Sequence, residues 1–193
     1  MNMKVPVTAL VLAAGSSSRF GSDKRLACLP GGQRVLDQTI QHCGEAGLDL
    51  LVVLGPDDEL LVEQLDDQGV KTVIAASASG GMGYSLAAGA AAVDEKTGIV
   101  VVLGDMPYVK PFTLRGVAER LAAGNGIVRP VYKGQPGHPV GFSAAYHRQL
   151  RALSGDSGAQ HLLHRHSGEL LSWNVSDPGV IRDIDYPADV TGS

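Results

Sequence analysis

TALVLAAGSSSRFGSDK is the sequence of residues 8–24, in which an apolar run passes directly into a loop of small polar residues. The apolar part, residues 8–14, is continuous rather than alternating, which is typical of a strand buried on both faces of a parallel sheet. In the loop, Gly15 and Gly21 permit tight turns and close approach of the backbone to a ligand. Because open α/β sheets bind ligands beyond the carboxyl ends of their strands, the loop is a candidate binding segment.

Further along the chain, apolar runs alternate with helical patterns. We expect strands at 8–14, 48–54, 71–75 and 99–103, and helices at 34–43, about 57–68, 84–93 and 112–123. Past Gly126 we expect strands at 127–131, 132–139, 140–143, 170–175 and 180–184, and helices at about 145–153 and 159–166. Strand–helix alternation indicates right-handed crossovers. The sequence therefore predicts an α/β, Rossmann-like three-layer αβα fold with a mostly parallel sheet, in one domain over residues 1–193.

Composition narrows the class of protein. The 193 residues carry a formal net charge of −4, without the basic excess of a typical nucleic-acid scaffold. Glycines interrupt the apolar runs before the roughly 20 residues that span a bilayer. Cys28 and Cys43 show no zinc-binding or C-x-x-C spacing, so we expect two reduced thiols. We expect a cytoplasmic protein with no nucleic-acid or membrane partner.

The loop after the first strand has the groups that bind phosphate. Ser16, Ser17 and Ser18 supply hydroxyls beside backbone N–H groups, Arg19 offers a planar fork, and Lys24 is a mobile point charge. The loop is not a Walker P-loop, a G-x-G-x-x-G dinucleotide fingerprint or a G-x-S-x-G hydrolase elbow. The alternative interpretation is a polar turn with two solvated cations.

Two further loops should reach the same edge. The apolar run at 99–103 is followed by Gly104 and Asp105, and a carboxylate there could bind Mg²⁺, although a turn or helix cap is the common role of such a residue. Residues 79–85, Ser-Gly-Gly-Met-Gly-Tyr-Ser, would open a helix and admit the edge of a flat base, or form only a flexible lead-in. Cations, a glycine-rich backbone and a carboxylate at one edge indicate phosphate chemistry.

Five segments in this order resemble the MobA-like nucleotidyltransferases, and most closely the molybdenum cofactor cytidylyltransferases. They are VLAAGSSSRFGSDK at 11–24, GGMGYSL at 80–86, LGDMP at 103–107, GHPV at 137–140 and DID at 183–185. The resemblance spans almost the whole chain and implies a fold of the nucleotide-diphospho-sugar transferase type. It implies catalytic roles for Arg19, Lys24 and Asp105, with Mg²⁺ held by Asp105. The nucleotide-binding residues that it implies are Leu12, Ala13, Ala14, Gly15, Ser16, Ser17, Lys24, Gly81, Met82, Gly83 and Ser85.

The acceptor side is less well specified. The resemblance makes His138 a candidate for acceptor binding, although a lone histidine in a turn is more often solvated or structural. Asp156 and Ser157 could receive the acceptor, or could equally cap the next helix. Asp183 and Asp185 alternate along an expected strand, so either could give Mg²⁺ a second carboxylate, and we favour Asp185. Departures from the family pattern at Gly141 and Tyr186 concern the acceptor more than the nucleotide.

The sequence thus predicts a magnesium-dependent enzyme that transfers CMP from CTP to the terminal phosphate of molybdopterin and releases pyrophosphate. A molybdoenzyme client is a further expected partner. The alternatives are a GTP-using or sugar- or polyol-phosphate nucleotidyltransferase of the same fold, and a non-catalytic molybdenum-cofactor chaperone. A nicotinamide oxidoreductase is disfavoured because the dinucleotide fingerprint is absent.

Overall fold

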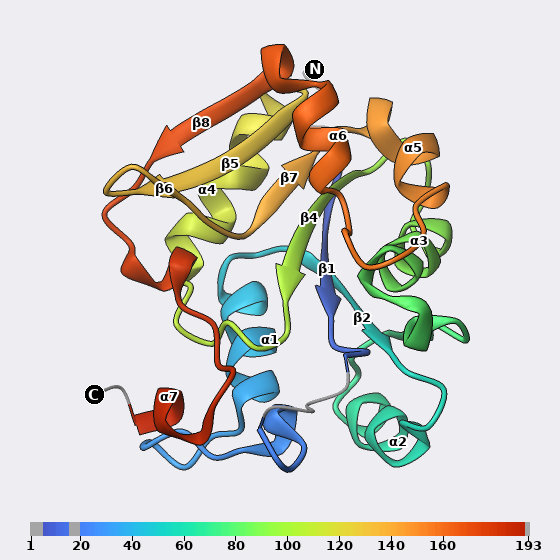
Figure 1. Cartoon of the computed structure of the whole chain (residues 1–193), viewed down its shortest axis with the longest axis vertical. Coiled ribbons are helices and arrows are strands. Elements are labelled where there is room, and N and C mark those ends of the chain that lie inside the picture. Colours follow the sequence, from blue (N-terminus) through green and yellow to red (C-terminus); the bar gives the residue numbers. More distant parts are fainter. Residues whose placement is uncertain (1–5, 16–19, 192–193) are drawn as a thin grey trace.

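A twisted, mostly parallel β-sheet lies between two layers of helices (Figure 1). The computed structural model describes residues 6–15 and 20–191. The strands are β1 (Val7–Leu12), β2 (Asp49–Leu54), β3 (Thr72–Ile74), β4 (Gly98–Leu103), β5 (Ile127–Tyr132), β6 (Gln135–Pro136), β7 (Val140–Phe142) and β8 (Leu170–Asn174). The α-helices are α1 (Val35–Glu45), α2 (Glu59–Asp67), α3 (Met82–Ala92), α4 (Pro111–Ala122), α5 (His147–Arg151), α6 (Gln160–Arg165) and α7 (Pro187–Thr191). The architecture is the expected α/β, Rossmann-like three-layer fold.

The strand order places the candidate loops together. The sheet runs β3-β2-β1-β4-β7-β5-β6, and β8 pairs with the other edge of β5. β1 pairs in parallel with both β2 and β4, whereas β7 is antiparallel to β4 and β5. The chain leaves β1 toward β2 on one side and later returns to its other side as β4. This reversal creates a crevice at the carboxyl ends of β1 and β4, the place where such sheets bind ligands.

Alternate residues of the central strands feed two hydrophobic cores, because successive side chains of a strand point to opposite faces. Ala9 and Val11 of β1 pack beneath α1, α2 and α4. Leu10 and Leu12 pack with α3, α5 and α6. A strand buried on both faces cannot alternate between apolar and polar residues, which explains the continuous apolar run in β1.

Two expected strands are wrong. The strand at 132–139 shortens to β6, because Lys133 (φ 49°) and Gly134 (φ 84°) form a two-residue turn that pairs Tyr132 with Gln135. The strand at 180–184 is replaced by a 3₁₀ helix, Pro178–Ile181. Pro178 starts this helix, and Asp177 caps it by accepting a hydrogen bond from the Gly179 N–H at 2.9 Å. In both places local turn chemistry, from glycine, proline or a capping aspartate, ends or replaces the expected strand.

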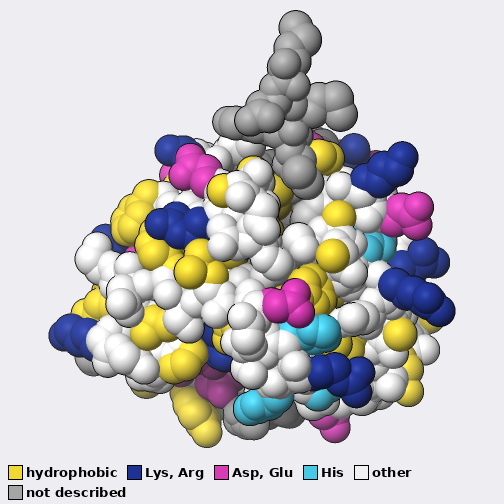
Figure 2. Space-filling model, turned by 90° about the horizontal axis from the view of Figure 1, so that it is seen from above, with side chains coloured by type: hydrophobic (Ala, Val, Ile, Leu, Met, Phe, Trp, Pro, Cys, Tyr) yellow, Lys and Arg dark blue, Asp and Glu magenta, His cyan; other side chains and the backbone are white. Residues whose placement is uncertain are grey.

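The opposite end of the molecule, at the amino ends of β1 and β4, has a mixed surface. Figure 2 shows basic, acidic and histidine side chains interspersed with hydrophobic ones on this face. Within residues 6–15 and 20–191, no helix has the length and apolar character needed to cross a membrane. Cys28 and Cys43 are both free thiols, and burial raises the pKa of Cys43 to about 12.

Candidate functional site

The ammonium of Lys24 lies between two carboxylates at the carboxyl edge of the sheet. Its Nζ donates to Asp105 Oδ2 at 2.6 Å and to Asp185 Oδ1 at 3.1 Å. Lys24 belongs to a 3₁₀ helix, Lys24–Leu26, that follows the β1 loop, and Asp105 follows β4. Residues that are 81 and 161 positions from Lys24 in the sequence thus meet at one point.

The charges of this group are coupled. Burial alone would lower the pKa of Lys24, but the hydrogen bonds and charges of Asp105 and then Asp185 outweigh burial and raise this pKa above its ordinary value. Asp105 Oδ1 is buried and has no hydrogen-bond partner among the described residues. A buried carboxylate oxygen without a donor is costly, and a cation that reaches it would remove that cost.

Backbone contacts bring Asp185 to the site. The Ile184 N–H donates to the Asp105 carbonyl at 2.9 Å, which ties the C-terminal segment to the loop after β4. Ile184 is fully buried in a small cluster with Leu29, Val35 and Val190. The Asp185 N–H donates to Asp189 Oδ2 at 3.0 Å. Helix α7 therefore also fixes Asp185, the residue after Ile184.

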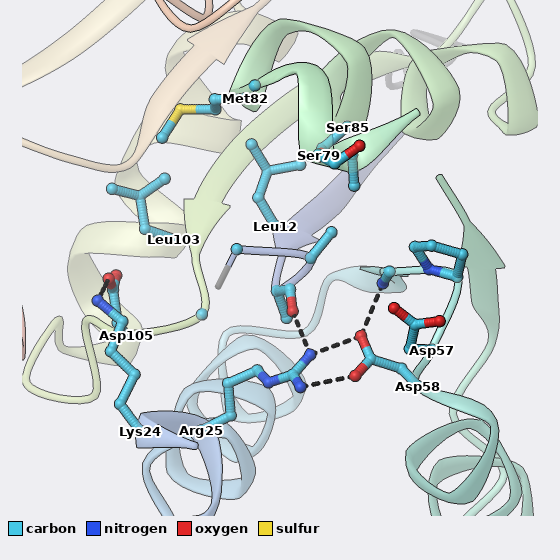
Figure 3. A pocket seen from close by; sticks show the side chains of 18 of the residues that line it. Leu12, Lys24, Arg25, Asp57, Asp58, Ser79, Met82, Ser85, Leu103 and Asp105 are labelled. Carbon is cyan, nitrogen blue, oxygen red and sulfur yellow. Dashed lines mark hydrogen bonds and ion pairs between the residues drawn. The ribbon is translucent and has the colours of Figure 1, made fainter. Parts of the chain in front are cut away.

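Arg25 holds the loops around the pocket together, a role that the sequence analysis missed. Its guanidinium binds both oxygens of Asp58 at 2.6 Å each and donates to the Ala13 carbonyl at 2.7 Å (Figure 3). It also binds Asp23 at 2.7 and 2.8 Å. Asp58 in turn accepts the Gly55 N–H at 2.7 Å. The loops after β1 and β2 are therefore locked to the residue next to Lys24.

Burial makes this network expensive to break. The side chains of Arg25 and Asp58 are only 13% and 14% exposed. Burial would lower the pKa of Arg25, but the carboxylates of Asp23 and Asp58 outweigh it and raise that pKa above its usual value. In the sequence, Arg25 is a single arginine directly after Lys24. Its partner Asp58 lies 33 residues away, so the pair cannot be recognised before the fold is known.

The wall on the opposite side of the pocket from Lys24 is the start of α3 and the loop 154–158 that covers it. The Gly83 N–H donates to the Gly155 carbonyl at 2.8 Å. Gly81 (φ 117°) has a conformation that favours glycine, and a Cβ there would collide with Asp156 Oδ1. Met82 packs on Gly158. Glycines are thus required at 81 and 83 because another segment lies directly on the helix N-terminus.

These elements enclose a pocket of about 750 Å³, shown from close by in Figure 3. This volume falls in the usual range for small-molecule sites. The expected site residues that line it are Leu12, Ala13, Ala14, Gly15, Lys24, Gly81, Met82, Ser85, Asp105 and Asp156. Lining residues that the sequence analysis did not single out include Arg25, Asp57 and Asp58.

Other expected residues lie elsewhere. Gly83 is buried behind the pocket wall, under Ser154 and Gly155. Ser157 is exposed, and its carbonyl, not its hydroxyl, accepts the Gln160 N–H at the start of α6. Asp156 lines the same pocket as the nucleotide candidates, so the structure separates it from His138. Ser16, Ser17 and Arg19 lie outside the described residues.

His138 lies on the far side of β4 from the pocket. It precedes Val140, which pairs with Val101 of β4, so its place is beside the carboxyl end of that strand. Burial, and then the charge of Arg129, lowers the pKa of His138 to about 4, although Asp183 acts in the opposite direction. Its Nδ1 is buried without a hydrogen-bond partner among the described residues. At neutral pH the imidazole is uncharged.

Asp105 and Asp185 have the chemistry of a magnesium site. Mg²⁺ prefers oxygen ligands and is usually held by one or two carboxylates together with substrate phosphates and water. The described residues contain no cluster of three or more His, Cys, Asp or Glu that could hold a metal by themselves. Two carboxylates, one with an unpartnered buried oxygen, at the mouth of a cation-bearing pocket therefore fit an ion that arrives with a polyanion.

Comparison with known proteins gives a consistent assignment. Residues 9–170 match the sequence family described as the MobA-like NTP transferase domain. The crystal structure of Rv0371c from Mycobacterium tuberculosis H37Rv is 32% identical, has a TM-score of 0.80, and the match covers 95% of each chain. A complex of Rv0371c with manganese is 31% identical with a TM-score of 0.78, again over 95% of each chain.

Curated relatives have more varied names. Nicotine blue oxidoreductase of Paenarthrobacter nicotinovorans is 25% identical over 93% of this chain and 92% of its own length. The bifunctional protein GlmU of Geobacter metallireducens is 29% identical over 77% of this chain. That match covers only 31% of GlmU, so the chain spans about a third of the larger protein. These relatives are similar to the chain in sequence, but they are named for different activities.

Proposed function

The chain belongs to the MobA-like NTP transferase family, and from this premise we infer that it transfers CMP from CTP to the terminal phosphate of molybdopterin with release of pyrophosphate. The family assignment establishes a nucleotidyltransferase domain. The choice of CTP and molybdopterin is our proposal, and it rests on the Leu-Ala-Ala-Gly and Gly-Gly-Met-Gly segments, which resemble the cytidylyltransferases.

The observation that carries the proposal is the contact of Lys24 with Asp105 and Asp185 at the mouth of the pocket. A triphosphate brings several negative charges that require a cation in a fixed place. Asp105 and Asp185 would hold Mg²⁺, and the manganese complex of a relative supports the presence of a divalent ion in a domain of this kind. The bound ion would neutralise charge on the phosphates during transfer.

The lining of the pocket suggests where the parts of a nucleotide would lie. Leu12 to Gly15 and Gly81, Met82 and Ser85 line it with small or apolar side chains and backbone, which would suit a flat base. Lys24 and Asp105 lie at the other end, where the phosphates would be. We place the base near the start of α3 and the triphosphate toward β4. Asp156, at the base end, then belongs to the nucleotide side rather than to the acceptor.

The acceptor would approach from the His138 side of β4. Because β4 separates His138 from the pocket, an acceptor there and a nucleotide in the pocket would meet at Asp105. A neutral imidazole can donate or accept one hydrogen bond per nitrogen, which suits a polar pterin more than a second charge. His138 therefore keeps its proposed role in acceptor binding, without Asp156.

The chemistry needs no general base. A phosphate acceptor is anionic at neutral pH, so its oxygen can form the new P–O bond to the α-phosphorus while the bond to the β-phosphate oxygen breaks. Lys24 would bind the phosphates and stabilise the charge on departing pyrophosphate. The remaining task is to hold the two phosphates in line, and the locked loops at Arg25 supply that rigidity.

The proposal is tested by measuring pyrophosphate release with CTP, GTP or ATP, with Mg²⁺, and with molybdopterin, a sugar phosphate or a polyol phosphate as acceptor. We expect release with CTP and molybdopterin. Release only with GTP or with another acceptor would reassign the substrates within the family. Tight molybdopterin binding without release from any triphosphate would support the chaperone alternative.

Site variants connect this activity to the geometry. Lys24→Ala and Asp105→Asn should retain the fold and lower turnover by about 10²–10³, by analogy with lost oxyanion donors. Asp49→Asn is the matched control, because this exposed carboxylate lies at the amino end of β2, the opposite end of the sheet. Turnover of either site variant equal to that of Asp49→Asn would contradict the assigned roles.

A further inference from the structure

We propose that Lys24 acts as a stand-in cation that holds the Asp105 and Asp185 carboxylates until a divalent ion and a triphosphate arrive together. The ammonium then leaves the carboxylates for the phosphates. This inference rests on the proposed function, and it adds a requirement for joint entry of metal ion and nucleotide. It concerns the contacts that Lys24 makes with the two carboxylates, whereas the metal site itself is part of the proposed function.

The geometry supports direct competition for the same oxygens. Lys24 Nζ lies 2.6 Å from Asp105 Oδ2 and 3.1 Å from Asp185 Oδ1, with 16%, 21% and 32% of these three side chains exposed. Both contacts join opposite charges, and the shorter one has the length of a strong charge-assisted hydrogen bond. A divalent ion that uses both carboxylates must therefore break at least part of this arrangement.

The oxygen that remains available does not remove the competition. Asp105 Oδ1 has no hydrogen-bond partner among the described residues, but it shares its carboxylate with the oxygen bound to Lys24. A cation bound there would lie within a few ångströms of the ammonium, and partial burial strengthens the repulsion between them. A metal ion alone is thus opposed by the charge of Lys24 in its present position.

A nucleotide gives Lys24 another partner. The side chain is a flexible four-carbon stem with a compact charge, and it lines the same pocket as Asp105. Its backbone stays fixed, because Arg25, the next residue, is bound to Asp23, Asp58 and the Ala13 carbonyl. Only the stem needs to turn for the ammonium to move from the carboxylates to phosphate oxygens.

Thermodynamic linkage then makes the two ligands cooperative. A triphosphate that removes Lys24 from the carboxylates raises their affinity for the metal, and the metal must raise the affinity for the triphosphate by the same factor. The protein would bind little free Mg²⁺ and would select the metal–nucleotide complex.

The direct test measures Mn²⁺ binding to the protein without nucleotide, from the electron paramagnetic resonance signal of free Mn²⁺ at 0.15 M salt. Lys24→Met should bind Mn²⁺ about tenfold or more tightly than the wild type, because two charge-assisted hydrogen bonds no longer oppose the ion. Adding Asp105→Asn to Lys24→Met should abolish the gain. If Lys24→Met does not fold, Lys24→Gln provides the same comparison.

Arg182→Met is the matched control for the loss of a positive charge. Its guanidinium lies 4.1 Å from the centre of the Tyr108 ring and three residues before Asp185. Arg182 packs on an aromatic ring and forms no ion pair with Asp105 or Asp185 among the described residues, and salt weakens the interaction of charges that are not in contact, so this variant should change Mn²⁺ affinity much less than Lys24→Met. Equal gains in Mn²⁺ affinity in both variants would show that the loss of any nearby positive charge has this effect, and would overturn the proposal.

Unchanged or weaker Mn²⁺ binding by Lys24→Met and Lys24→Gln would also overturn it. This result is separate from failure of the proposed function. If Lys24→Met gains Mn²⁺ affinity while the wild type releases pyrophosphate from no triphosphate, the stand-in role holds and the proposed reaction fails.

Discussion

Two neighbouring residues, Lys24 and Arg25, have opposite tasks in the site. Among the described residues, the ammonium of Lys24 contacts two carboxylates at the mouth of the pocket, whereas the fork of Arg25 is bound on both sides by carboxylates and to a backbone carbonyl. The backbone that carries a mobile charge must stay fixed if the charge is to reach the same phosphate in each catalytic cycle. Lys24 supplies the mobile charge, and Arg25 fixes the backbone beside it.

Arg25→Met should therefore destabilise the fold by about 2 kcal/mol or more, because it leaves the largely buried Asp58 without its partner. Asp58→Asn in the same chain should recover part of that loss by removing the unpaired charge. Urea denaturation measures both. Arg34→Met is the control, since the side chain of Arg34 is 41% exposed and lies 3.9 Å from Asp37, a contact worth less than about 1 kcal/mol. Equal losses in the two arginine variants would contradict the structural role of Arg25.

His138 should make stability depend on pH. The folded protein holds its pKa at about 4, below the ordinary value of 6.5, so the unfolded chain binds more protons between these values. Stability then falls as pH falls from about 6.5 to 4. Between pH 7.5 and pH 5 the wild type should lose about 2 kcal/mol more than His138→Gln, as measured by denaturation at both pH values. His161→Gln controls for loss of an exposed imidazole. Parallel losses in wild type and His138→Gln would refute this account of His138.

Residue types in loops predicted part of the site. A parallel sheet brings the loops after β1 and β4 to one edge, so the meeting of Lys24 with Asp105 follows from the strand pattern. The role of Arg25 could not be predicted, because it depends on Asp58 in a loop that only the fold brings near. Asp156 was expected at the acceptor, but its place depends on the Gly83–Gly155 hydrogen bond, which no local pattern shows.

At the scale of elements, α3 and the loop 154–158 act as one wall. A methyl group on Gly83 would lie 2.6 Å from the Ser154 carbonyl oxygen and 2.8 Å from that of Gly155. Gly83→Ala should push the loop away, cost about 1–3 kcal/mol as an overpacked contact, and weaken nucleotide binding several-fold. Denaturation and calorimetric titration with CTP measure the two effects.

Gly44→Ala is the control for Gly83→Ala, because Gly44 also lies in a helix but has nothing within 4 Å of an added Cβ. It should leave CTP binding unchanged and raise stability by up to about 1 kcal/mol. A Gly83→Ala protein as stable as Gly44→Ala, with unchanged affinity for CTP, would show that the wall tolerates movement.

Elements of the first half of the chain were predicted well because the strand–helix alternation there is regular. In the second half, Lys133 and Gly134 end a strand by a turn, and Asp177 with Pro178 start a 3₁₀ helix inside an apolar run. These short local signals compete with hydrophobic pattern over only a few residues. From the sequence alone, one cannot decide whether the turn and capping residues or the hydrophobic pattern will determine the local structure.

At the scale of the whole molecule, the chain closes its site with its last elements. The family match ends at residue 170, whereas Asp185 lies in the segment that returns beneath α1 and the β4 loop. Ile184→Ala should cost about 2–5 kcal/mol as a buried cavity and should also weaken Mn²⁺ binding in the presence of CTP, because it loosens the segment that positions Asp185.

Leu60→Ala removes an apolar side chain that is 75% exposed, and it should change stability by less than about 0.5 kcal/mol. Urea denaturation, and Mn²⁺ titration in the presence of CTP, compare the loss of a buried apolar side chain with the loss of an exposed one. Destabilisation of Ile184→Ala without any change in Mn²⁺ affinity would separate the C-terminal segment from the metal site.

The central claim is that Lys24, Asp105 and Asp185 form one centre for a metal ion and a triphosphate, and calorimetric titration of the wild type and Asp105→Asn with CTP, with and without Mg²⁺, tests it most directly. We predict that the wild type binds CTP about tenfold or more tightly with Mg²⁺ than without it, and that Asp105→Asn loses this difference. Equal CTP affinity in both proteins, unaffected by Mg²⁺, would contradict the account.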